Sequence, residues 1–351
     1  MPQRETCPPS VTSHTEAGIT TITLCRPALR NAVDPATARA LYAAFMDFEL
    51  DPAAQIAVLT GAGGAFCAGF DLKSAGGGEA DAWLASLDIP EDWHNPMADP
   101  RPGPMGPSRL MLTKPVIAAI EGPAVAGGME LAAWCDLRVM AQDAVAGVYC
   151  RRWGVPLIDG GTLRLPQILG QGRANDLILT GRPFDAPEAY QAGFANQLCA
   201  PGAALAEAQD LARDLARYPQ ACLQADHLSA RQDPAVLAAG LRREWRSAAA
   251  FLAEGRAGAI AFGGLFGWGV LFHPTIEWGH FRSWFGLRSF GRSGEKLVKR
   301  PPVLGAYWRS FDTWSAFICC LKAELVRDLL GRTLAHVHHG CGVIARAYFC
   351  G

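Results

Sequence analysis

The stretch Glu121–Asp136, EGPAVAGGMELAAWCD, constrains this chain more than any other part of the sequence. It follows the apolar run Lys114–Ile120, which predicts a buried strand, and Gly127 and Gly128 then open a helical pattern. Amides at a helix start lack partners and lie at the positive end of its dipole, so they can bind an oxygen with negative charge. Glu130 falls in the same first turn, and a base beside such a site suits enolate chemistry. A close-packed turn with Glu130 in solvent is the alternative that this stretch leaves open.

Composition narrows the classes of protein to which the chain can belong. The 351 residues are 50% hydrophobic and 19% charged, with a net charge of −1, so nothing indicates a nucleic-acid partner or an anionic membrane surface. The N-terminus lacks the apolar core of a signal peptide, and no apolar run is long and regular enough to predict a membrane span. The 11 cysteines show no repeated spacing, which favours reduced thiols and a cytoplasmic location.

A second glycine-rich stretch, GAGGAFCAGFDL at residues 61–72, follows a predicted strand. It departs from the dinucleotide-binding pattern because Phe66 occupies the third glycine position, and no phosphate-binding P-loop motif occurs in the chain. Two interpretations remain, a plain turn or a loop whose backbone amides point at a ligand.

Strand and helix patterns alternate first and are followed by helices alone, which predicts an α/β core and then a helical part. Strands are expected at 19–24, 56–60, 115–120, 136–141 and 145–149. Helices are expected at 35–50, from a cap at Thr162 to 169, and at 171–180, 185–193, 204–217, 219–231 and 233–253. We expect a flexible N-terminus at 1–14, a core at 15–200, a helical oligomerisation part at 201–258 and a mobile insert at 75–107.

The last part of the chain, residues 259–351, has a different composition. Residues 262–351 hold 11 basic and 5 acidic side chains, whereas the rest of the chain is acidic. His336, His338, His339 and Cys341 fit no standard zinc spacing. We therefore leave this extension unassigned and expect it to be poorly ordered, with nucleic-acid binding through its basic charge as a weaker alternative.

Four ordered motifs over residues 15–258 resemble the signatures of the crotonase, or enoyl-CoA hydratase/isomerase, family. They are RPALRNAVD, GAGGAFCAGFDL, KPVIAAIEGPAVAGGMELAAWCDLRV and GVPLIDGGTLRLPQILGQGRANDLILTGRPFDAPEAYQAGFANQL. The resemblance implies an α/β fold, a crotonase-like spiral of ββα repeats with C-terminal trimerisation helices. It also implies an acyl-CoA thioester as substrate, no tightly bound cofactor or metal, coenzyme A only as part of the substrate, and a homotrimer or dimer of trimers.

Carried over to this chain, the motifs assign an oxyanion hole to the backbone amides of Phe70 and Gly127. These positions lie in the two glycine-rich stretches, for which a loop of amide donors is one of the interpretations that the residues themselves leave open. The resemblance places coenzyme A or substrate contacts at four further positions: Arg30, Ala68, Asp71 and Leu72. For Arg30, a solvated loop side chain is the alternative.

The catalytic acids separate the reactions that the family performs. Glu130 matches the first of two glutamates that flank the water in the family's hydratases, but the second falls at Cys150. Asp159 matches the catalytic aspartate of the family's dienoyl-CoA isomerases, with a turn residue as the alternative. Cys150 and Cys67 could be nucleophiles, but buried structural cysteines are the commoner case.

Hydration of a 2-enoyl-CoA is therefore the function that we expect, with Glu130 and Asp159 moving protons. Double-bond isomerisation is an alternative because it needs only a proton shuttle. A non-catalytic acyl-CoA-binding protein is another, suggested by Cys150. Three tryptophans are candidates to line the acyl pocket: Trp83, Trp93 and Trp153.

Overall fold

The computed structural model describes residues 9–72, 74 and 78–249, so the predicted disorder of the extension at 259–351 lies outside the described residues. The strands are β1 (Val11–Glu16), β2 (Ile19–Leu24), β3 (Ile56–Gly61), β4 (Val116–Ile120), β5 (Pro123–Val125), β6 (Leu137–Ala141), β7 (Val145–Gly147), β8 (Phe184–Asp185) and β9 (Gln197–Cys199). The helices are α1 (Pro35–Leu50), α2 (Gly78–Ala85), α3 (Gly127–Trp134), α4 (Gly161–Leu169), α5 (Gln171–Thr180), α6 (Ala186–Gln191), α7 (Ala204–Ala216), α8 (Gln220–Ala230) and α9 (Pro234–Ala249).

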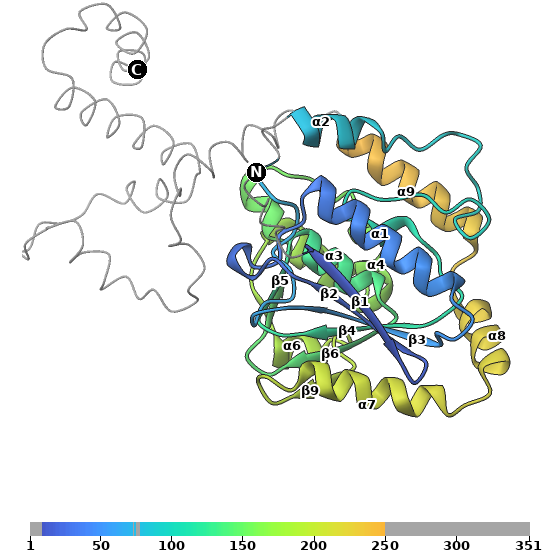
Figure 1. Ribbon diagram of the computed structural model, residues 1–351. Helices are drawn as coiled ribbons and strands as arrows, with labels where there is room; N and C mark the ends of the chain where they lie inside the picture. Colours follow the sequence, from blue (N-terminus) through green and yellow to red (C-terminus); the bar gives the residue numbers. More distant parts are fainter. Residues whose placement is uncertain (1–8, 73, 75–77, 250–351) are drawn as a thin grey trace, which may run out of the picture. The chain divides into compact units, whose positions relative to one another are not determined.

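The strands form two sheets between which the chain passes repeatedly. The larger has the order β1-β2-β3-β4-β6-β9 and is parallel except for β1, and the smaller has the order β5-β7-β8. Strand β4 lies in the larger sheet, β5 follows in the smaller one, and α3 completes a ββα unit (Figure 1). All five residues of β4 are buried, because the middle of the sheet is covered and α7 packs along β2, β3, β4 and β6. The ββα unit is the repeat that the motifs predict.

The beginning of the chain corrects one prediction. Residues 1–14 were expected to be flexible, but Val11–Glu16 form β1, which pairs antiparallel with β2. Ala17 and Gly18, both with positive φ, make the turn between the two strands. The strand has polar residues because most of its side chains are exposed at the edge of the sheet, so it lacks the apolar alternation that marks a half-buried strand.

The helix predictions are largely confirmed, with one exception. Helix α1 begins after Asp34, whose side chain accepts a hydrogen bond from the Thr37 amide, as its Asp-Pro start predicts. Thr162 does not cap α4; the helix begins at Gly161 after Gly160 in a left-handed conformation. Its first amides are bound instead by carboxylates from other helices. No helix among the described residues has the length and apolar character to cross a membrane.

The predicted insert at 75–107 contains α2, and two tryptophan side chains form hydrogen bonds within it. The Trp83 indole donates to the Pro104 carbonyl at 3.1 Å, and the Trp93 indole donates to the Asp99 carbonyl at 2.7 Å. Both rings are buried in the hydrophobic core, whereas Trp153 is half-buried. The two buried tryptophans therefore hold the insert against the rest of the fold.

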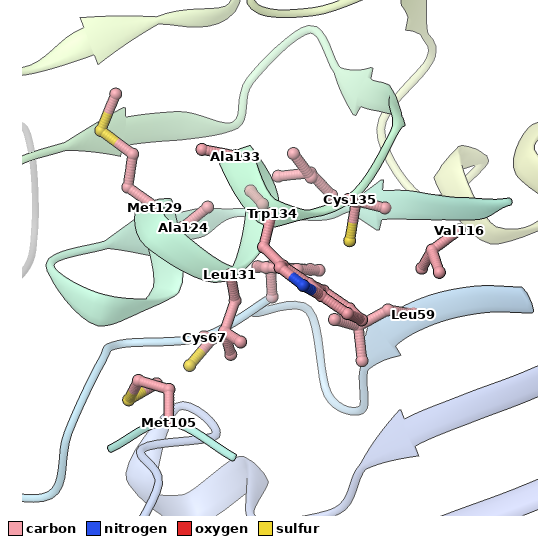
Figure 2. Close-up of a cluster of buried hydrophobic side chains, with 14 of the residues drawn as sticks. Leu59, Cys67, Met105, Val116, Ala124, Met129, Leu131, Ala133, Trp134 and Cys135 are labelled. Atoms are coloured by element: carbon pink, nitrogen blue, oxygen red, sulfur yellow. The ribbon is translucent and has the colours of Figure 1, made fainter. Parts of the chain in front are cut away.

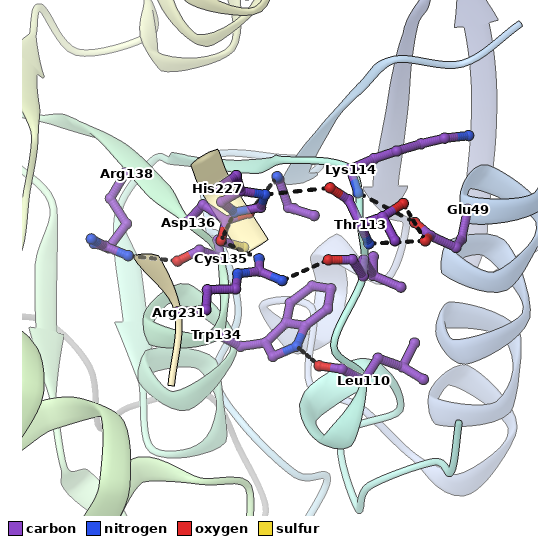
Figure 3. Close-up of polar contacts among 12 residues, drawn as sticks. Glu49, Leu110, Thr113, Lys114, Trp134, Cys135, Asp136, Arg138, His227 and Arg231 are labelled. Carbon is purple, nitrogen blue, oxygen red and sulfur yellow. Dashed lines mark hydrogen bonds and ion pairs between the residues drawn. The ribbon is translucent and has the colours of Figure 1, made fainter. Parts of the chain in front are cut away.

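Helix α8 is fastened to the sheet through Asp136, which precedes β6. Its carboxylate accepts the Val116 amide at 2.8 Å and pairs with His227, at 2.9 Å, and with Arg231 (Figure 3). Burial would raise the pKa of Asp136, but the contacts to His227 and Arg231 outweigh it and hold that pKa below its usual value. The helical part is thus joined to the core by a charged contact at the start of a central strand.

Candidate active site

The start of α3 is built around a strained turn. Ala126 has φ 53 and ψ −126, a conformation that a residue with a side chain rarely adopts. Such strain is maintained where the surroundings impose it, and it is common at functional sites. Every residue of α3 is buried, and Figure 2 shows Leu131 and Trp134 of this helix among buried side chains of other segments. The turn at Ala126 therefore aims the Gly127 amide from a rigid, close-packed helix.

The second glycine-rich stretch approaches this turn directly. A β-carbon placed on Gly69 would lie 2.9 Å from the Gly127 nitrogen, and one on Gly128 would lie 2.1 Å from the Cys67 carbonyl oxygen. Neither the Phe70 nor the Gly127 amide donates a hydrogen bond to any partner within the described ranges. Two unpaired amides that lie beside one another are the donors an oxyanion hole requires. The structure thus brings together the two predicted positions.

Glu130 is buried, in contrast to the solvated alternative, with 3% of its surface exposed. Its Oε1 atom accepts hydrogen bonds from the Asp159 and Gly161 amides, both at 2.9 Å. Its Oε2 atom accepts none from the part of the chain that the structure describes, which leaves this oxygen for a ligand. Burial, and next the charges of Asp159 and Glu244, raise the pKa of Glu130 well above its usual value. Glu130 therefore holds a proton more readily than an exposed glutamate.

Asp159 is equally buried, and its own backbone amide is one of the two that bind Glu130. Its Oδ1 atom accepts the Met105 amide at 2.9 Å and the Ser108 hydroxyl, while Oδ2 has no hydrogen bond from the described residues. Met105 also packs against Gly127, since a β-carbon on Gly127 would lie 2.8 Å from its sulfur. Burial raises the pKa of Asp159 to about 6, against hydrogen bonds from Ser108 and Met105 that lower it. The predicted pair of acids is thus adjacent, and each acid has one anchored oxygen and one free oxygen.

Both candidate cysteines are buried thiols. Cys150 is 7% exposed, and burial, then the charge of Glu130, raises its pKa to about 12. Cys67 donates to the Asn31 carbonyl at 3.2 Å, and burial raises its pKa to about 12 as well. A thiol at such a pKa is almost wholly protonated at neutral pH and is a poor nucleophile. Cys150, which the family resemblance aligns with the second glutamate, is therefore a protonated thiol near Glu130 and cannot act as a carboxylate.

Three of the four predicted coenzyme A contacts lie on the loop that carries Phe70, and the fourth, Arg30, lies at the end of an earlier turn beside it. The Ala68 amide donates to the Arg30 carbonyl at 3.0 Å, so these two positions are adjacent. The Asp71 carboxylate accepts a hydrogen bond from Arg26 at 3.1 Å and is buried, so we interpret it as fastening the loop. Leu72 is half-buried at the end of this loop. The roles of Arg30, Ala68 and Leu72 as ligand contacts stay predictions.

Sequence reasoning missed the side chains that support the two acids. Ser108 and Arg109 belong to a short turn of 3-10 helix, Pro107–Arg109, and Glu244 belongs to α9. One signal could have identified Glu244: it is an acidic residue within the buried stripe of α9 that includes Leu241, Trp245 and Ala248. An acidic residue at such a position requires a partner.

Two further observations concern the surroundings of the site and its capacity to hold a metal ion. A cavity of about 220 Å³ lies at the other end of α3, with Trp134, Asp136, Arg138 and Arg231 among its lining residues, and it contains none of the predicted site residues. In the described ranges, no group of three or more histidine, cysteine or acidic side chains is arranged to hold a metal ion.

Gly161 offers a test of how closely the Glu130 carboxylate is positioned. A β-carbon at Gly161 would lie 2.8 Å from Oε1 of Glu130, so Gly161→Ala is expected to displace this carboxylate. Because small misplacements of catalytic groups are costly, we expect kcat for a 2-enoyl-CoA to fall about 10²-fold. Gly172→Ala is the matched control: it lies in α5 with open space around it, and a gain of up to about 1 kcal/mol in helix stability is expected without loss of rate. Equal rates in both variants would contradict the assigned geometry.

Comparison with known proteins agrees with this site. The enoyl-CoA hydratase/isomerase family model matches residues 14–102 and 107–262. An enoyl-CoA hydratase of Mycobacterium tuberculosis is 35% identical over 219 residues, which are 60% of this chain and 76% of that protein. A carnitinyl-CoA dehydratase of Salmonella arizonae is 41% identical over 197 residues, 55% of this chain and 69% of that protein.

Solved structures show the same fold. A carnitinyl-CoA dehydratase from Mycobacterium avium has a TM-score of 0.60 at 29% identity, covering 73% of this chain and 97% of its own. An enoyl-CoA hydratase from Mycobacterium tuberculosis has a TM-score of 0.54 at 35% identity, covering 63% and 81%. The crotonase-like fold predicted from the motifs is thus confirmed. Because the family model matches most of the sequence, including both glycine-rich stretches and both acids, the chain belongs to the enoyl-CoA hydratase/isomerase family.

Proposed function

We propose that this protein catalyses the addition of water to the double bond of a 2-enoyl-CoA thioester, and the reverse dehydration. One observation carries the proposal. Two unpaired amides, of Phe70 and Gly127, lie beside each other next to two buried acids that each keep one oxygen free. Relatives whose names denote hydratase and dehydratase activities support the same reaction.

The amides would act on the thioester oxygen. As a nucleophile adds to the β-carbon, negative charge develops on this oxygen, and hydrogen bonds aimed at it stabilise the transition state more than the substrate. Removing one such donor in other enzymes costs about 10²–10³ in rate. These donors need little reorganisation to reach the oxygen, because a strained turn and a buried helix already hold the Gly127 amide in place.

The two acids would divide the proton transfers between them. Burial raises the pKa of both acids, that of Asp159 to about 6 and that of Glu130 well above its usual value, and we therefore assign the role of acid to Glu130 and that of base to Asp159. Asp159 takes a proton from water while the hydroxyl adds to the β-carbon, and Glu130 gives its proton to the α-carbon. The proton on Asp159 then returns to Glu130 through solvent. Asp159 thereby supplies the second carboxyl that Cys150 lacks.

Steady-state assays on acyl-CoA substrates test this function. We expect purified protein, without added metal or cofactor, to consume crotonyl-CoA, measured as loss of the enoyl-thioester absorbance with formation of the 3-hydroxyacyl product. Conversion of a 3-enoyl-CoA to its 2-enoyl isomer, with no hydration, would instead establish the isomerase. Binding of coenzyme A thioesters with no turnover of either substrate would establish a non-catalytic member of the family.

Three further properties complete the proposal. Assembly as a trimer or dimer of trimers through the C-terminal helices is proposed from the family resemblance. The proposed cytoplasmic location is supported by the free thiols of the six described cysteines. A role in the metabolism of fatty acyl thioesters follows from the proposed reaction.

A further inference from the structure

We propose that Glu244, on α9, is a positioning residue that sets the geometry of both active-site acids by holding the turn between Asp159 and Thr162. This inference rests on the proposed function for its kinetic consequence. Its structural basis is a set of hydrogen bonds that link the last described helix to the site.

Two carboxylates bind the amides of this turn alternately. The Asp159 and Gly161 amides donate to Glu130, as described above. The Gly160 amide donates to Oε1 of Glu244 at 2.6 Å, and the Thr162 amide donates to Oε2 at 2.8 Å, as does the Thr162 hydroxyl. Four consecutive amides at the start of α4 are thus shared between α3 and α9, and a shift of one carboxylate moves the partners of the other.

The contacts of Glu244 define its role. It is 4% exposed, and both of its oxygens accept hydrogen bonds from the turn. A buried carboxylate requires such partners, and here the amide donors occupy both oxygens of Glu244, so neither oxygen is left for a substrate. Glu244 is therefore not suited to exchange protons with substrate, in contrast to Glu130 and Asp159, which each keep a free oxygen.

Neighbouring residues of α9 fix Glu244 in place. Arg242 donates to the Pro90 carbonyl at 3.0 Å and to the Trp93 carbonyl, which ties α9 to the insert. The centre of the Trp245 ring lies 4.7 Å from the Arg109 guanidinium. Arg109 follows Ser108 in the chain, and the Ser108 hydroxyl donates a hydrogen bond to Asp159. Glu244 thus has little freedom to move independently of α9.

Electrostatics add a measurable consequence. The charge of Glu244 raises the pKa of both Glu130 and Asp159, while Arg109 lowers that of Asp159. The Arg164 guanidinium interacts with all three carboxylates. Removing the charge of Glu244 should therefore lower the pH at which Asp159 ionises.

The first test is kinetic, with Glu244→Gln as the variant. Gln can keep one accepted hydrogen bond but presents an amide donor to Thr162. We expect kcat for crotonyl-CoA to fall about 10-fold or more through misplacement of the acids, with KM unchanged and the acidic limb of the pH–rate profile moved to lower pH. Combining it with Glu130→Gln should cost less than the product of the two single losses, because the two carboxylates bind the same turn. Glu207→Gln, the same change at an exposed position of α7, is the control.

The second test does not depend on turnover. Hydrogen exchange of the peptide that contains residues 159–162 is compared between the wild type and Glu244→Gln, with residue resolution. Faster exchange at 159 and 161, which bind Glu130, as well as at 160 and 162 supports the proposal. Faster exchange at 160 and 162 alone, or an unchanged kcat and pH profile, would show a simple helix cap and overturn it.

Two provisions keep these outcomes distinct. If wild-type protein turns over no acyl-CoA, the proposed function fails, while hydrogen exchange still decides the role of Glu244. If Glu244→Gln does not fold, Thr162→Val removes only the hydroxyl donor at an exposed position, and a smaller effect in the same direction is expected.

Discussion

Replacing Glu130 by Gln is expected to lower kcat/KM for a 2-enoyl-CoA by about 10²–10⁴-fold, the usual contribution of a general acid or base. Gln keeps the shape of the side chain, and its amide oxygen can still accept the Asp159 and Gly161 amides that bind Oε1. The variant therefore removes proton transfer while it preserves the turn. Steady-state rates with crotonyl-CoA, together with a thermal melt, measure the two effects separately.

The matched control is Cys150→Ser, at the position next to Glu130 where the family's hydratases carry their second glutamate. Since the pKa of the Cys150 thiol is raised to about 12, it takes no part in the proposed proton transfers, and the rate should change little. A large loss in Cys150→Ser together with an unchanged rate in Glu130→Gln would reverse the assignment. An unchanged rate in Glu130→Gln alone would remove Glu130 from the mechanism.

Asp159→Asn is expected to lower the rate of hydration by about 10²-fold or more, because Asp159 is the proposed base. Asn can still accept the Met105 amide and the Ser108 hydroxyl through its oxygen, so the anchoring contacts are retained. The pH–rate profile provides a second signature. In the wild type the rate should rise as Asp159 ionises, at a pH of about 6, and this limb should be absent from the variant.

The same substitution is expected to stabilise the fold at neutral pH. Burial raises the pKa of Asp159 from 3.8 to about 6, so the folded state binds its proton more tightly than the unfolded state does. The ionised carboxylate therefore reduces stability above pH 6, and this cost disappears as the pH falls below 3.8. At pH 7 we expect Asp159→Asn to unfold with a free energy higher by roughly 2 kcal/mol. Denaturant melts at pH 7 and pH 4 measure the difference, and a variant that is less stable at pH 7 would contradict it.

Local patterns predicted the parts of the site that lie close together in the sequence. Gly127 and Glu130 share one helical turn, so a glycine pair followed by an acid was enough to mark them as candidates. Phe70 and Asp159 required the family resemblance, because nothing near them in the sequence shows that they approach α3. The structure then supplied what neither source could give, namely that Glu130 is buried and that Asp159 binds Met105 and Ser108.

The remaining differences between the sequence-based predictions and the structure have physical causes. Strand β1 was missed because an exposed edge strand needs no apolar face. Thr162 was predicted to cap α4 because threonine is a good capping residue, but Glu244 binds the same amide from a distant helix. Contacts between residues far apart in sequence leave no periodic signal in either segment. The partners of Glu244 could therefore be recognised only from the fold.

The distances along the chain between the site residues have a consequence for how the enzyme becomes active during synthesis. Phe70, Gly127 and Asp159 come from three separate segments, and Glu244 lies 84 residues beyond the Gly160 amide that it binds. Contacts of such long range form late, because the loops between them must be closed first. A nascent chain that has completed its sheet but not yet α9 would therefore bury most of its core while its two acids still lack their final arrangement. Enzymatic activity would then report completion of α9 rather than formation of the hydrophobic core.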